Sequence, residues 1–130
     1  MLLDTSGLLA CLDVSEARRG KAVACYDSHA SRLTHNYVLA ELIALAQARR
    51  LPREPVIRFV GQLSADRDID MIWVDRVLHH QAIALLTAQL DKTYSLCDAV
   101  SFVLMRSRNM QEALSTDHHF EQAGFSILLK

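Results

Sequence analysis

The chain has 130 residues, of which 51% are hydrophobic and 22% are charged, and its formal net charge is −1. This size and composition are typical of one globular domain with a single hydrophobic core. A net charge near zero argues against a strongly basic nucleic-acid binder. The apolar runs are also far shorter than the roughly 18 residues that span a bilayer.

The N-terminus and the cysteines indicate where the protein resides. Met1-Leu2-Leu3-Asp4 contains neither a basic segment nor a small-residue cleavage site, so we expect no secretory signal. Cys11, Cys25 and Cys97 have no CxxC spacing, and their number is odd. Buried free thiols in a reducing compartment are the plain interpretation, which predicts a cytoplasmic protein.

Strands and helices alternate along the predicted chain, which contains no repeat and no Gly/Ser linker. Asn36 can cap a helix, Pro52 breaks the chain between two helices, and Asp75 can cap a third. The expected strands are 1–4, 31–34, 69–74, 113–115 and 125–129. The expected helices are 5–12, 15–29, 36–50, 52–66, 75–90, 96–107 and 117–122.

This alternation predicts a single α/β domain over residues 1–130 with a mainly parallel sheet. The helix at 96–107 is apolar on nearly all sides, which places it centrally. Open parallel sheets bind ligands at the carboxyl ends of their strands. Asp4 and Asp117 both follow a predicted strand and precede a helix, so we expect them at that edge.

Four carboxylates lie beside or inside apolar segments: Asp4, Glu41, Asp98 and Asp117. Burying a lone carboxylate is costly unless a cation or a hydrogen-bond donor compensates it. If the four acids converge, their oxygens form a site suited to Mg²⁺, which then acts as a Lewis acid in phosphodiester chemistry.

Each acid also has a purely structural interpretation. Asp4 and Asp117 can be helix N-caps, and Asp98 follows Ser95 at the spacing of a capping box. Glu41 is harder to explain in this way, because it shares its helix face with apolar neighbours. A module whose acids are all helix caps therefore remains the alternative.

Other polar and aromatic residues have simpler interpretations. The pairs His79-His80 and His118-His119 diverge by about 100° on a helix, so neither pair readily chelates one ion. Trp73 is expected in the core, and Tyr94 is expected to pack or to stack on a base. Six arginines close or flank predicted helices, where they can meet phosphates or compensate helix dipoles: Arg49, Arg50, Arg53, Arg58, Arg106 and Arg108.

Four short motifs occur in a familiar order: Leu2-Leu3-Asp4-Thr5-Ser6, Val38-Leu39-Ala40-Glu41-Leu42, Ser95-Leu96-Cys97-Asp98-Ala99 and Ser115-Thr116-Asp117-His118-His119-Phe120. Together with the length, they resemble the PIN-domain proteins of the VapC toxin type. The likeness covers essentially the whole chain. His118 departs mildly from the basic residue that relatives often carry.

The resemblance implies a three-layer α/β/α sandwich and an Mg²⁺-dependent ribonuclease, with Mn²⁺ as an alternative ion. Asp4, Glu41, Asp98 and Asp117 would form the acidic catalytic site. We expect Asp4 and Asp98 to bind the metal directly and Glu41 to orient the attacking water. The implied supporting residues are Thr5, Ser6, Ser95 and Thr116.

The resemblance also implies an RNA substrate, a cognate antitoxin and a homodimer, without a membrane partner. Two rival classes fit less well. A haloacid-dehalogenase-like phosphatase needs a second Asp where this chain has Ser6. A response-regulator receiver needs an acidic pair after its first strand and a lysine after a late strand, whereas Lys130 is terminal. A non-catalytic α/β binding or signalling module stays the alternative.

Overall fold

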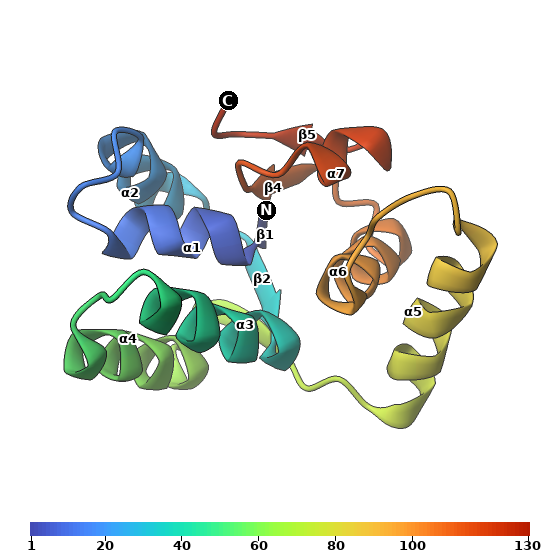
Figure 1. Cartoon of the computed structure of the whole chain (residues 1–130), viewed down its shortest axis with the longest axis horizontal. Helices are drawn as coiled ribbons and strands as arrows, with labels where there is room; N and C mark the ends of the chain where they lie inside the picture. The colour runs from blue at the N-terminus through green and yellow to red at the C-terminus, as the bar shows by residue number, and fades with distance from the viewer.

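Five short strands form one sheet in the computed structural model, which describes residues 1–130 (Figure 1). Every neighbouring pair of strands is parallel. The strands are β1 (Leu2–Leu3), β2 (Arg32–His35), β3 (Ile69–Ile72), β4 (Glu112–Leu114) and β5 (Ser126–Ile127).

The order of the strands creates a switch point beside β1. Across the sheet the order is β3-β2-β1-β4-β5, so the chain first builds outward from β1 through β2 to β3. It then returns to the other side of β1 and builds outward again through β4 to β5. In such sheets, a crevice forms at the carboxyl ends of the two strands where the direction reverses. Here these strands are β1 and β4.

Seven helices cover the sheet: α1 (Thr5–Leu12), α2 (Arg19–Ser28), α3 (Asn36–Ala48), α4 (Arg53–Ala65), α5 (Arg76–Ala88), α6 (Leu96–Ser107) and α7 (His118–Gln122). In Figure 1, α1 to α4 lie on one side of β1 and β2, and α5 and α6 lie on the other. The predicted three-layer arrangement with a parallel sheet is therefore confirmed.

Two hydrophobic clusters separate the layers, as the two-residue period of a strand requires. Leu3 on β1 packs into a cluster with α1, α3 and α4. Its neighbour Leu2 faces the opposite cluster, which includes Phe102 on α6 and Phe120 on α7. Leu2, Leu3, Phe102 and Phe120 are all fully buried, so both faces of the central strand are dry.

Two contacts at the carboxyl edge set how the helices meet the sheet. A Cβ on Gly7 would lie 2.0 Å from the Leu114 carbonyl oxygen, so only glycine lets α1 approach β4 this closely. On the opposite face, His35 at the end of β2 contacts the Ser101 hydroxyl of α6 through Nε2 at 2.8 Å. Both side chains are completely buried, and their contact links α6 to β2.

Most predicted elements are confirmed, with small changes at their ends. Helix 96–107 has the predicted bounds, and Asp75 caps α5 by accepting the Leu78 N–H. The second helix begins at Arg19 rather than near Ser15, because residues 13–18 form turns closed by the Asp13 and Glu16 side chains. The last strand is shorter than predicted and covers only Ser126–Ile127.

Two predictions around β3 are wrong. Trp73 is 66% exposed, because β3 is an edge strand that ends at Ile72 and leaves the next residue outside the core. Asn36 is not the cap of α3, since His35 occupies that position. Its side chain accepts the Val74 N–H instead and fastens the end of β3.

None of the helices has both the length and the apolar character that crossing a bilayer requires.

Candidate metal and catalytic site

Asp4 lies at the carboxyl end of β1 and is only 3% exposed. It stands at the N-cap position of α1, but its side chain accepts no capping hydrogen bond. Instead, Oδ2 accepts hydrogen bonds from the hydroxyls of Ser6 and Ser115, each at 2.8 Å. The cap interpretation therefore does not explain why this acid is buried.

The electrostatics of Asp4 are unfavourable in the absence of a cation. The pKa of its carboxyl is raised to about 6, mainly by burial and to a smaller extent by the negative charges of Asp98 and Asp117. The two serine hydroxyls oppose the shift but do not overcome it. A bound divalent cation would remove this cost.

Ser6 and Ser115 join the ends of β1 and β4. Each hydroxyl has one proton and donates it to Asp4, so its oxygen is left to accept. Ser6 Oγ accepts the Thr116 N–H at 3.0 Å, and Ser115 Oγ accepts the Asp117 N–H at 2.9 Å. This network connects the buried Asp4 to the backbone that carries Asp117.

Asp98 enters the same region from the first turn of α6. Its Oδ2 accepts the Ser95 N–H at 3.0 Å, while Ser95 Oγ accepts the Asp98 N–H, which completes the predicted capping box. Oδ2 also lies 3.0 Å from His119 Nδ1. Burial raises the pKa of Asp98, and the nearby charge of Asp117 contributes in the same direction.

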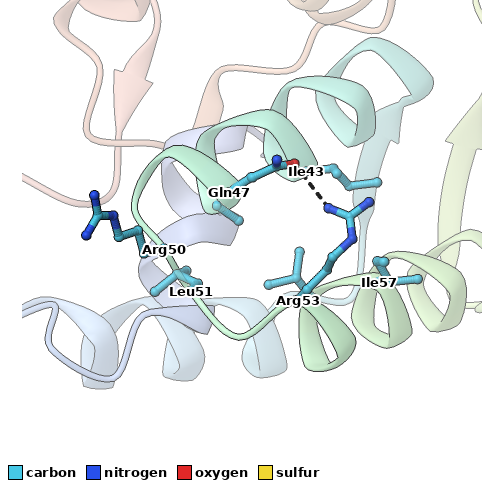
Figure 2. A pocket seen from close by; sticks show the side chains of 8 residues that line it. Ile43, Gln47, Arg50, Leu51, Arg53 and Ile57 are labelled. Atoms are coloured by element: carbon cyan, nitrogen blue, oxygen red, sulfur yellow. Dashed lines mark hydrogen bonds between the residues drawn. The ribbon is translucent and has the colours of Figure 1, made fainter.

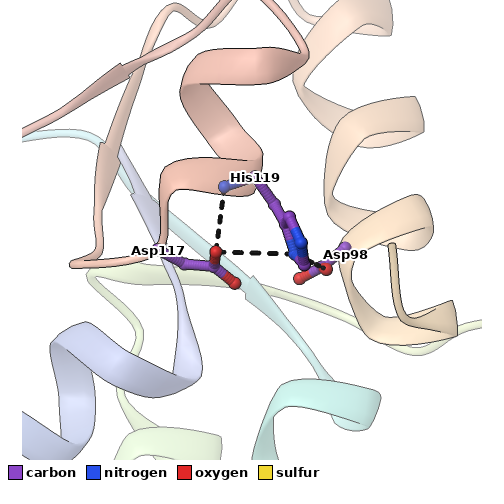
Figure 3. A group of neighbouring side chains, drawn as sticks. All are labelled: Asp98, Asp117 and His119. Atoms are coloured by element: carbon purple, nitrogen blue, oxygen red, sulfur yellow. Dashed lines mark hydrogen bonds and ion pairs between the residues drawn. The ribbon is translucent and has the colours of Figure 1, made fainter. Parts of the chain in front are cut away.

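Asp117, Asp98 and His119 gather where α7 begins (Figure 3). Asp117 caps α7 through Oδ1, which accepts the His119 N–H at 2.9 Å. One potential ligand atom from each of the three side chains lies within 4.8 Å of those of the others. Asp98 Oδ1 and Asp117 Oδ2 make no hydrogen bond within the chain, so each carboxylate keeps one oxygen free for another ligand.

Glu41 approaches from α3 and is half-buried. Its side chain makes no hydrogen bond or ion pair within the chain, but its charge acts on the thiol of Cys97 together with those of Asp4 and Asp98. Burial raises the pKa of that thiol, and the charges of Glu41, Asp4 and Asp98 raise it further. Glu41 is therefore within electrostatic reach of the site, although it is outside the tight group of Asp98, Asp117 and His119.

The predicted supporting residues have different surroundings. Ser6 and Ser95 bond the two acids directly, and Thr116 donates its backbone N–H to Ser6. The Thr5 hydroxyl is buried and has no hydrogen-bond partner. Sequence reasoning missed Ser115 and His119, because their importance depends on strand register and on the direction of α7.

The larger of two surface pockets contains none of the four acids among its lining residues. Figure 2 shows the side chains that line it. It lies between the end of α3 and the start of α4, where Arg53 donates to Gln47 Oε1 at 3.1 Å. Since α3 begins at the acidic edge and is about 20 Å long, this pocket faces the opposite end of the sheet. Arg50 and Arg53 line it, so these two arginines do not flank the carboxylates.

Comparison with known proteins places this geometry in a family. The sequence profile of the PIN domain matches residues 1–126. The chain is a PIN domain. The acids Asp4, Asp98 and Asp117 of this PIN domain all lie within the matched residues 1–126, at the switch point of the sheet.

Two curated relatives and one solved structure are similar to this PIN domain over nearly its entire length. The relatives are the 23S rRNA-specific endonuclease VapC20 of two Mycobacterium tuberculosis strains. Each is 32% identical over 126 residues, which is 96% of this chain and 95% of the relative. The structure is that of M. tuberculosis VapC20, described as a sarcin-ricin loop cleaving toxin, with a TM-score of 0.86 and 28% identity over 96% of this chain and 95% of that one.

Proposed function

We propose that this PIN domain is a metal-dependent endoribonuclease and the toxin of a type II toxin–antitoxin pair. Its proposed catalytic residues are Asp4, Glu41, Asp98 and Asp117. The observation that carries the proposal is the convergence of buried Asp4 with Asp98 and Asp117 at the switch point of a chain that matches VapC20 along 96% of its length.

The donor chemistry of the site fits a hard divalent cation such as Mg²⁺ or Mn²⁺. Such ions take carboxylate oxygens and retain several waters. Asp98 and Asp117 each keep one oxygen free of hydrogen bonds, and Asp4 is buried beside them without a positive partner. When bound, the ion would supply Lewis acidity that stabilises negative charge on the scissile phosphate.

Each acid of the chain then has a distinct task. We propose that Asp4 and Asp98 hold the ion directly, and that Asp117 binds it either directly or through water. Ser6 and Ser115 fix the orientation of the Asp4 carboxylate. Glu41 approaches from α3, in the helix layer opposite α6. It orients the attacking water and accepts its proton.

For the substrate we propose ribosomal RNA, because the relatives at 32% identity are named as 23S rRNA-specific endonucleases. Sequence-specific enzymes of RNA act mostly on loops whose bases are unstacked and accessible. We therefore propose a loop in ribosomal RNA as the target, cut by hydrolysis of one phosphodiester bond.

The similar proteins are named as an endonuclease specific for 23S rRNA and as a toxin that cleaves the sarcin-ricin loop. For this chain we propose a cognate antitoxin that blocks access to the acids, a homodimeric assembly and a cytoplasmic location. The half-buried Cys11 and Cys25 and the buried Cys97 are all free thiols, which agrees with a reducing compartment.

Metal removal tests the proposed activity. The purified protein is incubated with intact ribosomes or ribosomal RNA, and new 5′ ends are mapped by sequencing. We expect a discrete cleavage site with Mg²⁺ or Mn²⁺ and a rate at least about a hundredfold lower in EDTA. Restoring the ion after chelation should restore cleavage at the same position. Cleavage that persists undiminished in EDTA would contradict the proposal.

A further inference from the structure

We propose that His119 is a direct ligand of the divalent cation, through Nδ1, alongside Asp98 and Asp117. This inference rests on the proposed function and specifies the metal that the site prefers. A site that combines carboxylate oxygens with an imidazole nitrogen favours Mn²⁺ over Mg²⁺, because Mg²⁺ is a hard ion that takes oxygen ligands whereas imidazole suits transition metals.

The spacing of the donor atoms agrees with a shared ion. His119 Nδ1 lies 3.0 Å from Asp98 Oδ2 and 3.5 Å from Asp117 Oδ1. These two oxygens also accept the backbone N–H groups of Ser95 and His119, so each would bind the ion through a remaining lone pair. In an octahedral shell with bonds of about 2.1 Å, neighbouring donors are about 3.0 Å apart. Figure 3 shows the imidazole ring directed between the two carboxylates. A hydrogen bond from Nδ1–H would produce similar distances. Whether Nδ1 can give up its proton to bind an ion depends on what the other ring nitrogen, Nε2, contacts.

Nε2 of His119 lies 3.0 Å from the Thr93 hydroxyl. A histidine that binds a metal through one nitrogen keeps its proton on the other and donates it to a neighbouring acceptor, which fixes the ring. Thr93 Oγ1 can accept that proton. Binding of the ion at Nδ1 displaces any proton there to solvent, and the neutral ring is left with a satisfied Nε2–H.

The ring of His119 is also held in place by packing. Its side chain is only 17% exposed, and the Tyr94 ring meets it edge-on with centroids 5.5 Å apart. The adjacent His118 provides a contrast, since its side chain is 71% exposed and its Nδ1 lies 3.7 Å from Asp117. The two rings lie 4.8 Å apart between centroids, but only His119 reaches Asp98 as well as Asp117, so only His119 belongs to the group.

Pulsed electron paramagnetic resonance of the Mn²⁺-loaded protein tests this ligand without measuring cleavage. We expect a nitrogen coupling to the bound Mn²⁺ that changes when the protein is labelled with ¹⁵N-histidine. His119→Gln should abolish the coupling and weaken Mn²⁺ binding at least about tenfold, with a smaller effect on Mg²⁺. The matched variant His118→Gln should retain both the coupling and the affinity.

The outcomes separate this inference from the proposed function. Bound Mn²⁺ without histidine coupling in the wild type, or the same coupling in His119→Gln, would overturn the ligand assignment and leave the nuclease proposal intact. A wild-type protein that binds Mg²⁺ but no Mn²⁺ would overturn the ligand assignment alone, and one that binds neither ion would overturn both. If His119→Gln fails to fold, ¹⁵N-labelled His118→Gln decides the assignment, because an unchanged coupling in that variant leaves His119 as the histidine that reaches these acids.

Discussion

Replacing Asp98 with asparagine is expected to reduce RNA cleavage by about a thousandfold, which corresponds to about 4 kcal/mol of transition-state stabilisation. The substitution removes one negative charge from the site where the ion is proposed to bind and changes the side-chain shape very little. The rate is measured under single-turnover conditions with saturating Mn²⁺, so that weaker substrate binding does not mimic slower chemistry.

The fold should survive this change. In Asp98→Asn, the side-chain amide oxygen would still accept the N–H of Ser95, and the Ser95 hydroxyl would still accept the backbone N–H at position 98. The substitution also removes a buried carboxylate whose pKa is already raised by desolvation. We therefore expect the free energy of unfolding without metal to be unchanged or higher. Lost activity with retained stability identifies a chemical role.

Asp91→Asn is the matched control, because Asp91 is an exposed acid with 73% of its side chain accessible and only a loose contact to Lys92. It makes the same change in net charge away from the site, and we expect wild-type cleavage. If Asp98→Asn cleaves RNA within about threefold of this control, the assignment of Asp98 is wrong.

Asp4→Asn is expected to stabilise the metal-free protein by up to about 3 kcal/mol at pH 7.5. Burial raises the pKa of Asp4 to about 6, compared with about 3.9 in an unfolded chain. The native state therefore binds more protons than the unfolded state between these values. The stability that Asp4 contributes is present in acid and is lost as the pH rises through 6.

Urea unfolding in EDTA at a series of pH values measures this effect. The stability difference between Asp4→Asn and the wild type should be small near pH 4 and should grow to its full value above pH 6. Added Mn²⁺ should reverse the ranking, since a ligand that binds the native state stabilises it and the variant binds that ligand less well. A difference in the free energy of unfolding that does not vary with pH would show that burial does not raise the pKa of Asp4.

Buried His35 also makes the free energy of unfolding depend on pH, so the effect of Asp4 has to be measured as a difference between the variant and the wild type. Burial lowers the pKa of His35 to about 4, below the value of about 6.5 in an unfolded chain. Its contribution to stability is therefore complete above pH 6.5 and is lost as the pH falls toward 4. This trend opposes that of Asp4, so the two partly cancel in the wild type. Subtracting the wild-type curve from that of Asp4→Asn removes the His35 contribution.

Much of the fold can be predicted from local sequence signals. The bounds of α6 were predictable because Ser95 and Asp98 form a capping box before a segment that is apolar on nearly all sides. The alternation of strands and helices predicted the parallel sheet. Trp73 was predicted incorrectly, because the alternating pattern of β3 continues past the point where an edge strand loses its neighbours.

The acids could be found from the sequence, but their surroundings could not. Asp4, Asp98 and Asp117 stand out because they interrupt or flank apolar segments. Ser115 has the sequence pattern of an ordinary strand end, and only the register that pairs Leu3 with Leu114 brings its hydroxyl to Asp4.

His119 shows a second limit of sequence reasoning. The spacing of adjacent histidines indicated that they do not chelate one ion together. It did not reveal that one member of the pair could join carboxylates from other elements, since this depends on how α7 packs against α6. Contacts between distant segments carry this information, and local spacing does not.

Locating the metal tests the central claim most directly. Crystals of the protein soaked in Mn²⁺ are measured at the manganese absorption edge, and the anomalous difference map identifies the ion without interpretation of the surrounding density. We predict one strong peak within bonding distance of Asp4 and Asp98 and beside Asp117, at the carboxyl ends of β1 and β4. Mn²⁺ bound elsewhere, with no signal among these carboxylates under conditions that support RNA cleavage, would contradict the account.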